Sequence, residues 1–524
     1  MASACLRHTE LPGTSKLFAD YLYRFDRVAP FYRYDPADPE SYRSAASALV
    51  YPEERRRALI EALAAQGNDP AALEALAQPD CVAVVTGQQV GLFSGPCYTI
   101  YKALTAVRLA ARLRDSGIPA APVFWLATED HDFDEINHAW TLSGENDAVR
   151  HEVANPGTSS TRPVGPIAIP KYPIEELADA LRGLPFAEEV LALAGEAYRD
   201  GATLGAAFRA LMERLLPGRG LIYVDPLEMP IRRLAAPILQ QAALQAPALM
   251  DRVIARNAEL AEAGYHAQVH VEPKTSPFFL LEGGERVHLL RDGGTFDGMD
   301  AEGLAARAEH LSPNAILRPV MQDYLLPTAA LIGGPAEIAY LAQSQVLYEG
   351  LGRPAPVFVS RAGFTLLDER AAKSMERYRL AVSDFFEGPE PLRAKVAARI
   401  TPPELETSLG ATRAATADAV DRLHAALSSF DPTLGEALAK SRAKMLYQLD
   451  KIRAKTEREA LRRNARADAE MHALTALLYQ ERHLQERFYT ILPFLARHGF
   501  DLIERVEQHV RLECPDHIVL TASS

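Results

Sequence analysis

Short, uncharged, apolar segments recur between residues 81 and 361, and they constrain the fold more than any other feature of the sequence. The first, CVAVVTG at 81–87, leads through a glycine-rich connection into an amphipathic helix, and APVFWLATED follows at 121–130. Strands without charge are typical of parallel sheets that are buried on both faces. Similar segments lie at 220–226, 325–335 and 355–361. The pattern predicts an α/β core with a parallel sheet, because β–α–β crossovers are almost always right-handed.

Two stretches between these strands have a different texture, and we predict that both are insertions into a core spanning residues 1–387. Residues 143–215 are punctuated by Gly and Pro and then become helical in pattern. Residues 266–312 place apolar side chains on either side of Gly283–Gly284, a dipeptide typical of a tight turn with positive φ. The second insertion is therefore predicted to carry a β-hairpin.

The chain changes character after Gly388, where strand patterns stop and helical patterns take over. Residues 436–492 contain neither Gly nor Pro, and apolar side chains recur there at helical spacing. We expect this stretch to form an antiparallel, coiled-coil-like hairpin with a preceding helix at 404–430. The helical region is predicted to cover residues 388–492, and residues 493–524 are expected to pack back on the core.

The composition disfavours several classes of partner. Acidic residues outnumber basic ones, and the formal net charge of -13 argues against general binding to nucleic acids or anionic membranes. No apolar run is long enough to span a bilayer, and the first residues lack the apolar stretch of a secretion signal. The four cysteines lie far apart without a CxxC pair, so neither a zinc ribbon nor a disulfide scaffold is expected. We expect a cytoplasmic protein with small-molecule partners.

Ligands of open parallel sheets bind where strands end and helices begin, so the residues after each predicted strand form the candidate site. The first group could hold an anion such as a nucleotide phosphate, through backbone N–H groups, amides and glycines that permit close approach. Its members are Gly87, Gln88, Gln89, Ser94 and Gly95. Lys102 lies about two turns into the next helix and reaches a substrate only if its face points there. A tight turn with helix caps explains the same residues equally well.

Acids and histidines gather after the second predicted strand. Either histidine could act as a general base or hold a phosphate, and the acids could bind a substrate amine. Histidine with carboxylates also suits a divalent metal, but the spacing matches no standard zinc pattern, and we expect no protein-bound metal. A charged helix start explains part of the cluster. The candidates are Glu129, Asp130, His131, Asp132, Asn137 and His138.

The third and fourth predicted sites follow the strands at 325–335 and 355–361. A glycine pair before a helix favours anion binding, although a simple helix cap gives the same pattern. An arginine at a strand end is a good ligand for phosphate or carboxylate. The candidates are Arg318, Gln322, Gly333, Gly334, Glu337, Tyr340 and Arg361. The motifs GxxxxGKS/T, GxGxxG, GxSxG and HExxH are absent, so no P-loop or dinucleotide fingerprint holds a nucleotide here.

Read in order, these segments resemble the bacillithiol biosynthesis cysteine-adding enzyme family. The likeness extends over nearly the whole chain, including its opening residues LFADYLYRFDRVAPFY. The segments that carry it are TGQQVGLFSGPCYTIYK (86–102), FWLATEDHDFDEINH (124–138), LRPVMQDYLLPTAALIGGPAEIAYLAQ (317–343) and LQERFYTILPFLARHGFDLI (484–503).

The resemblance implies a Rossmann-like core similar to class I nucleotidyltransferases and aminoacyl-tRNA synthetases, with two connecting-peptide insertions. It also implies a helical coiled coil through which the chain forms a homodimer. The implied reaction adds L-cysteine to glucosaminyl-malate by an amide bond, the last step of bacillithiol synthesis. An adenine nucleotide, ATP or ADP, is associated with the family, and Mg²⁺ would accompany it.

The resemblance and the chemistry together suggest roles for the candidate residues. Amide formation from a free carboxylate is uphill, so we hypothesise that ATP activates cysteine as an adenylate or acyl phosphate. His131 or His138 would accept the proton of the attacking sugar amine. The acids Glu129 or Asp130 would bind the cysteine ammonium. The expected anion ligands are the Gly95 and Gly334 N–H groups with Arg361, and those of the malate carboxylates are Arg318 or Lys102.

Two other classes of function remain open at this point. The chain could be a non-catalytic scaffold that binds a nucleotide or thiol and uses its coiled coil as a partner arm. It could also be a metal-dependent hydrolase built on the cluster at 129–138.

Overall fold

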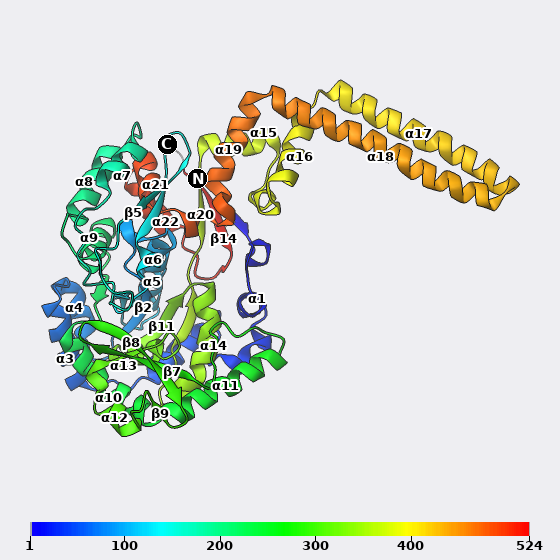
Figure 1. The fold of residues 1–524 in the computed structure, drawn as a ribbon. Coiled ribbons are helices and arrows are strands. Elements are labelled where there is room, and N and C mark those ends of the chain that lie inside the picture. The colour runs from blue at the N-terminus through cyan, green and yellow to red at the C-terminus, as the bar shows by residue number, and fades with distance from the viewer. Residues whose placement is uncertain (1–2, 523–524) are drawn as a thin grey trace. The chain divides into compact units, whose positions relative to one another are not determined.

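The computed structural model describes residues 3–522, which form two compact units (Figure 1). The first unit contains residues 3–366 and 484–522, and the second is Leu367–His483. The second unit begins and ends earlier than the helical region predicted at residues 388–492. The chain thus leaves the first unit once and later returns to it.

A five-stranded parallel sheet is the centre of the first unit, as the uncharged segments predicted. Its first two strands in the chain lie side by side, and the next strand continues the sheet beyond them. The chain then returns to the other side of the first strand for the last two. In spatial order the strands are β12 (Val357–Ser360), β11 (Thr328–Gly333), β2 (Val82–Gln88), β3 (Ala120–Leu126) and β6 (Ile222–Val224). The switch of direction falls between β11 and β2, the position where open α/β sheets bind ligands.

Helices cover both faces of this sheet, which explains why its strands carry no charge. Val82 and Val84 of β2 belong to a core cluster with α2 and α5, whereas Ala83 and Val85 belong to a larger cluster on the opposite face. The helices of the core are α1 (Lys16–Tyr23), α2 (Pro39–Ser47), α3 (Glu53–Ala65), α4 (Pro70–Ala77), α5 (Tyr98–Asp115), α10 (Met229–Leu244), α11 (Ala246–Glu262), α13 (Arg318–Leu325) and α14 (Pro335–Gly350).

Gly87 at the end of β2 is required by the close approach of β3. The residue pairs with Trp125, and a Cβ atom at this position would lie 2.8 Å from the Trp125 carbonyl oxygen. Any other residue would push the two strands apart at the edge where the candidate site lies.

The two predicted insertions are separate substructures. The first is mainly helical, and the second is a four-stranded antiparallel sheet whose hairpin turns at Gly283 and Gly284, both with positive φ, as the sequence predicted. The predicted range 143–215 contains β5 (Ala148–Glu152), α7 (Ile174–Leu181), α8 (Ala187–Ala197) and α9 (Leu204–Leu215), and it is preceded by α6 (Phe133–Ile136) and β4 (His138–Leu142). The second contains β7 (Thr275–Glu282), β8 (Glu285–Asp292), β9 (Thr295–Phe296), α12 (Ala301–Ala305) and β10 (Leu311–Pro313).

A three-stranded sheet joins the two ends of the first unit. Its order is β1 (Ser3–Leu6), β14 (His517–Ala522) and β13 (Phe364–Asp368), with β1 antiparallel to β14. The expectation that strands stop after Gly388 is therefore wrong at β14. Its residues HIVLTA form an uncharged, β-branched run of the kind that predicted the other strands, and this signal was overlooked. The helices before it are α20 (Gln485–Phe488), α21 (Leu492–His498) and α22 (Asp501–Gln508).

The second unit is helical, and its two longest helices form the predicted antiparallel hairpin (Figure 1). Three ion pairs between them fix the register: Glu406 with Arg453 at 2.9 Å, Arg413 with Asp450 at 2.8 Å, and Asp421 with Arg442 at 2.7 Å. The glycine-free stretch is not one helix, because Asn464 interrupts it and caps the next helix. The helices are α15 (Glu369–Tyr378), α16 (Pro389–Ile400), α17 (Pro403–Phe430), α18 (Pro432–Arg463) and α19 (Ala465–Tyr479).

No helix within residues 3–522 is both long and apolar enough to cross a membrane.

Candidate functional site

A small cavity lies at the switch point of the parallel sheet, between the carboxyl ends of β2 and β11. Residues from both glycine-rich turns and from α13 and α14 line it. Its polar or backbone-exposing lining residues are Gly87, Arg318, Gln322, Gly333, Glu337 and Tyr340. The first and third predicted groups therefore meet at the position where ligands of doubly wound sheets bind.

Lys102 of α5 contacts Gly87 and Glu337, two residues that line this cavity, and so holds the two turns together. Its Nζ donates to the Gly87 carbonyl and to Gln88 Oε1, both at 2.9 Å, and forms an ion pair with Glu337. Glu337 also accepts the Gly334 N–H at 2.8 Å. Burial lowers the pKa of Lys102, although the Glu337 carboxylate opposes that shift. All three donors of this ammonium group are used within the protein, so its geometry is that of a positioning residue.

Arg318 lines this cavity and its positive charge is available to a ligand. Its Nη2 donates to the Tyr340 hydroxyl at 3.0 Å, and within residues 3–522 no carboxylate lies at ion-pair distance from it. Burial alone would lower the pKa of Arg318, but Tyr340, Glu337 and Asp130 raise it, so the group stays charged. A partly buried guanidinium without a counterion favours an anionic ligand.

The acidic and histidine-rich segment reaches the same edge of the sheet through Gln89. The Gln89 amide donates to both Asp130 Oδ2 and Glu135 Oε2 at 2.7 Å. Burial would raise the pKa of Asp130. Hydrogen bonds from Gln89 and from backbone N–H groups, together with the charge of Arg286, lower it. Asp130 is therefore ionised at neutral pH and close enough to Arg318 to affect its pKa.

His131 is held neutral by an arginine. Arg286 Nη1 lies 2.9 Å from His131 Nδ1, and because an arginine can only donate, this ring nitrogen must be an unprotonated acceptor. Burial and the charge of Arg286 lower the pKa of His131, with Asp130 acting in the opposite sense. The remaining proton sits on Nε2, so His131 presents a hydrogen-bond donor rather than a free base.

His138 has the opposite arrangement. Its Nδ1 lies 3.0 Å from Asn137 Oδ1, an acceptor, so Nδ1 carries the proton and Nε2 keeps its lone pair. His138 is half-buried at the start of β4. Asp132 is exposed and caps α6 by accepting the Glu135 N–H at 3.1 Å.

Several predicted site residues already have partners within the protein. Buried Glu129 accepts from Arg232 Nη1 at 2.8 Å and from the Ser312 hydroxyl at 2.7 Å, which offsets its charge. Arg361 pairs with Glu486 through two contacts of 2.6 and 2.9 Å, both residues being buried. The Gly334 N–H, expected to bind an anion, donates instead to Glu337. These groups shape the site rather than present free charge to a ligand.

Ser94 and Gly95 lie in a turn of positive φ that faces the first insertion. The Ser94 N–H donates to the Tyr198 hydroxyl at 3.1 Å, and the Gly95 N–H donates to the Leu92 carbonyl at 2.9 Å. Neither residue lines the cavity at the switch point. The backbone donor assigned to an anion at Gly95 is thus occupied by the turn itself.

Four residues that shape the site were not predicted from the sequence: Tyr98, Arg232, Arg286 and Glu486. The Tyr98 hydroxyl accepts from Gln88 Nε2 at 3.1 Å, and the Arg361 guanidinium lies 5.1 Å from the Tyr98 ring centre. Tyr98 and Glu486 both lie inside segments that carried the family resemblance. The other two arginines lie in an irregular helix start and in the hairpin, where no local pattern marks them.

The donor set fits an anion better than a metal. Within residues 3–522 no group of three or more His, Cys, Asp or Glu side chains is arranged to hold a metal ion. Arg318, with the Tyr340 hydroxyl beside it, could bind a carboxylate or phosphate, and Asp130 could bind an ammonium group.

Two sequence models of known families match this chain. The one described as "Bacillithiol biosynthesis BshC, N-terminal Rossmann-like domain" matches residues 1–362, and the one described as the "C-terminal coiled-coil domain" of BshC matches residues 364–522. Similar proteins carry the description "Putative cysteine ligase BshC". That of Solibacter usitatus is 51% identical over 99% of this chain and 100% of its own length. Those of Koribacter versatilis and Salinibacter ruber are 35% and 32% identical, over 99% and 96% of this chain and 100% and 96% of theirs.

Proposed function

This chain belongs to the bacillithiol biosynthesis BshC family, and we propose that it is the cytoplasmic ligase that joins L-cysteine to glucosaminyl-malate by an amide bond. The observation that carries the proposal is Arg318, a charged guanidinium without a carboxylate partner at the switch point of the sheet. Glucosaminyl-malate brings carboxylates that such a group binds, and cysteine brings an ammonium that the nearby Asp130 suits.

Activation of the cysteine carboxylate must precede amide formation, because the free acid does not react with an amine downhill. We propose ATP with Mg²⁺ as the activating substrate, giving either a cysteinyl adenylate with release of pyrophosphate or a cysteinyl phosphate with release of ADP. Attack by the sugar amine on the activated carbonyl forms the C–N bond and expels AMP or phosphate. The amine loses one proton in this step, and a base must take it.

His138 is the better of the two candidate bases. Its Nε2 keeps a lone pair while Asn137 orients the ring through Nδ1, whereas Nδ1 of His131 is occupied by Arg286. His131 would instead donate from Nε2 to an oxygen of the activated substrate. Replacing His138 by Gln should lower kcat by about 100-fold, whereas His131→Gln should act more on KM. A larger loss of kcat in His131→Gln would reverse this assignment.

The test of the function is turnover with defined substrates. Purified protein with cysteine, glucosaminyl-malate, ATP and magnesium should form bacillithiol, measured by thiol labelling and mass spectrometry. Arg318→Gln should raise KM for glucosaminyl-malate about 10- to 100-fold, the value of one charge-assisted hydrogen-bond pair. Arg233→Gln removes an equally positive but exposed group and should leave KM unchanged. No product in the wild-type reaction would favour a non-catalytic scaffold.

A metal-dependent hydrolase is disfavoured by the occupation of its proposed ligands. Glu129 is tied to Arg232 and Ser312, and Asp130 is bound by Gln89 and backbone N–H groups. His131 already accepts from Arg286. Metal binding here would break most of these contacts.

The helical hairpin supports a proposal that the protein works as a homodimer. Both long helices expose large apolar side chains, which a monomer in water would ordinarily cover. The exposed residues on α17 and α18 are Leu405, Leu423, Phe430, Leu434, Met445, Tyr447 and Ile452. A second copy of this chain is the partner that the family's coiled-coil domain suggests.

A further inference from the structure

Tyr98, in the first turn of α5, lies beside the cavity at the switch point and is partly exposed. Lys102 Nζ lies 5.8 Å from the centre of its ring. The same Nζ contacts Gly87 and Glu337, which line the cavity. Tyr98 is therefore one contact away from the cavity wall.

A chain of hydrogen bonds with a fixed direction ends at the Tyr98 hydroxyl. A lysine can only donate, so Gln88 Oε1, which lies 2.9 Å from Lys102 Nζ, is the acceptor. The other end of this amide, Nε2, then donates to the Tyr98 hydroxyl oxygen at 3.1 Å. A tyrosine hydroxyl that accepts a hydrogen bond still has its own proton to give. Within residues 3–522 no acceptor takes this proton, so Tyr98 is left as a donor.

The cations next to the Tyr98 ring are already paired. Arg361, at 5.1 Å from the ring centre, pairs with Glu486, and Lys102 pairs with Glu337. Burial raises the pKa of Tyr98, although nearby arginines oppose the shift, so the hydroxyl keeps its proton at neutral pH. The position thus offers a neutral donor. Such a donor suits a charge that develops only during a reaction, whereas an unpaired arginine suits a group that is charged throughout.

Two consecutive glutamines at the end of β2 hold two different groups. Gln88 binds Tyr98, and Gln89 Nε2 donates to Asp130 Oδ2 at 2.7 Å. Asp130 is the group proposed above for the cysteine ammonium, and only one carbon atom separates the ammonium of an amino acid from its carboxyl carbon. The same strand end therefore carries an acceptor for the ammonium and a donor for the carbonyl.

We propose that Tyr98 is a catalytic residue whose hydroxyl donates a hydrogen bond to the carbonyl oxygen of activated cysteine. This bond stabilises the negative charge that the oxygen gains when the sugar amine attacks. The inference rests on the proposed function, and it adds the group that holds the reacting carbonyl.

The step needs no further reactant. The amine lone pair forms the C–N bond, and the π electrons of the carbonyl move onto the oxygen that faces Tyr98. The hydroxyl proton is shared with this oxygen but stays on Tyr98. When the C=O bond forms again, the bond to AMP or phosphate breaks with its electron pair, and the amine proton passes to His138.

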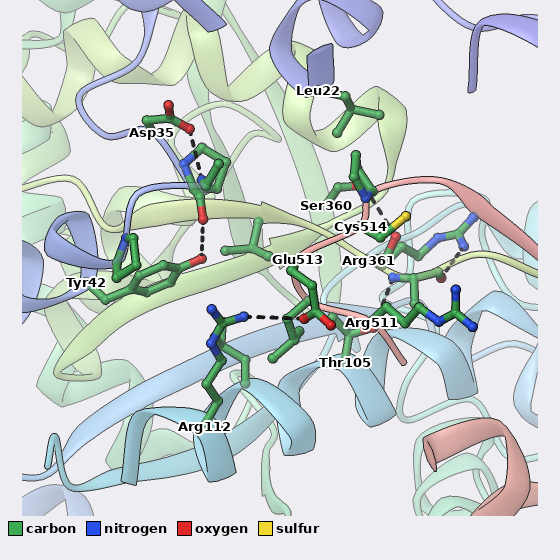
Figure 2. A pocket seen from close by; sticks show the side chains of 18 of the residues that line it. Leu22, Asp35, Tyr42, Thr105, Arg112, Ser360, Arg361, Arg511, Glu513 and Cys514 are labelled. Carbon is green, nitrogen blue, oxygen red and sulfur yellow. Dashed lines mark hydrogen bonds and ion pairs between the residues drawn. The ribbon is translucent and has the colours of Figure 1, made fainter. Parts of the chain in front are cut away.

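Tyr98→Phe removes only the hydroxyl and should lower kcat about 100-fold, the typical effect of losing one such donor. The KM values for cysteine and glucosaminyl-malate should change by less than about twofold, because the donor acts only once the oxygen is charged. Tyr42→Phe is the matched control and should keep the wild-type kcat. Tyr42 lines a separate cavity of about 390 Å³ (Figure 2), where its hydroxyl donates to the Pro36 carbonyl at 2.9 Å. A loss that falls mainly on KM would refute the assignment.

Gln88→Glu tests the direction of the hydrogen bonds. A carboxylate can accept from both Lys102 and Tyr98, so it takes the Tyr98 proton while the ring stays in place. We expect kcat to fall about as far as in Tyr98→Phe, and the double variant to lose no more than either single variant. Additive losses would contradict this direction and, with it, the free proton on Tyr98.

A measurement without turnover separates this proposal from the ligase function. The probe is a phosphonamidate in which a tetrahedral P–O⁻ group replaces the carbonyl that joins cysteine to glucosaminyl-malate. Calorimetry should find that Tyr98→Phe binds it at least about tenfold more weakly than wild type, with cysteine binding unchanged. Equal binding of the probe by the two proteins would overturn the donor, and so would an undiminished kcat in Tyr98→Phe. Wild-type protein that forms no bacillithiol, but binds the probe through Tyr98, would refute the ligase and leave the donor in place.

Discussion

At the scale of single residues, the Arg361–Glu486 pair is the clearest case of a buried charge that depends on one partner. Burial would raise the pKa of Glu486, but Arg361, His517 and hydrogen bonds lower it to about 2. Phe364 N–H also donates to this carboxylate at 3.1 Å. The pair joins the end of β12 to the returning C-terminal segment.

Replacing Glu486 by Gln should therefore destabilise the protein strongly, because Arg361 would remain buried without a counterion. We expect the free energy of unfolding at pH 7 to fall by about 3–5 kcal/mol in urea titrations. Glu504→Gln removes an exposed carboxylate and should change it by less than about 0.5 kcal/mol. A loss for Glu486→Gln no larger than for this control would contradict the prediction.

The same variant has a pH signature. The folded pKa of Glu486 lies below its unfolded value of 4.5, so its stabilisation is present above that value and is lost as pH falls toward 2. The stability difference between wild type and Glu486→Gln should accordingly shrink over this window.

Asp323 shows the opposite pKa shift from Glu486, upward instead of downward. Burial is the main cause that raises its pKa to about 7, although the Tyr348 hydroxyl donates to it and lowers the shift. A raised pKa means that its contribution to stability is present below 3.8 and is lost as pH rises through 7. Asp323→Asn should therefore stabilise the protein at pH 8 by about 1–3 kcal/mol relative to its effect at pH 3. Urea unfolding of both proteins at the two pH values measures this difference. An effect of Asp323→Asn that is equal at pH 3 and pH 8 would contradict the prediction.

At the scale of secondary-structure elements, two glycines of the helical hairpin are expected to respond oppositely to the same substitution. A Cβ atom at Gly435 would lie 2.2 Å from Ser428 Oγ and 3.1 Å from its Cβ, whereas at Gly410 the nearest atom is Arg453 Nη2 at 3.7 Å. Gly410→Ala should stabilise α17 by about 1 kcal/mol through helix propensity.

Gly435→Ala should destabilise the protein overall. The tip of the hairpin must open to admit the methyl group, and this cost exceeds the gain from helix propensity. Thermal unfolding followed by circular dichroism at 222 nm should show Tm rising in the first variant and falling in the second. Equal rises would mean that the close approach at Ser428 relaxes without cost.

The elements also show what the sequence could and could not predict. The strands β2, β3 and β11 were predictable because burial on both faces removes charge, and the β7–β8 hairpin because Gly283–Gly284 demands positive φ. β14 was overlooked, although its residues HIVLTA carry the same uncharged, β-branched pattern. Side chains differ: the strand ends located Arg318 and Asp130, but Arg286 and Glu486 pair with residues more than a hundred positions away, which no local pattern shows.

At the scale of the whole molecule, the exposed apolar side chains of α18 lead to a prediction about assembly. Met445 and Ile452 are seven positions apart and so lie on one side of the helix. Replacing both by Lys should convert the proposed dimer to a monomer, because burying two ammonium groups in an apolar contact is costly. Light scattering should then report the mass of one 57.4 kDa chain instead of two.

Ala443 and Ala454 provide the matched control, since helical spacing places them on the opposite side of α18. Lys at both of these positions adds the same charge and should leave the dimer intact. A wild-type protein that is monomeric at micromolar concentration would refute the assembly.

The antiparallel pairing of β1 with β14 also bears on how the chain is made. A ribosome releases β1 before β14, so β1 waits for its partner until the residues between the two strands have been synthesised. The helical hairpin, contiguous in sequence, can fold while the enzyme is still being synthesised. Nascent chains that stall before His517 would leave an unpaired strand edge exposed to aggregation, which makes complete synthesis a condition for a soluble product.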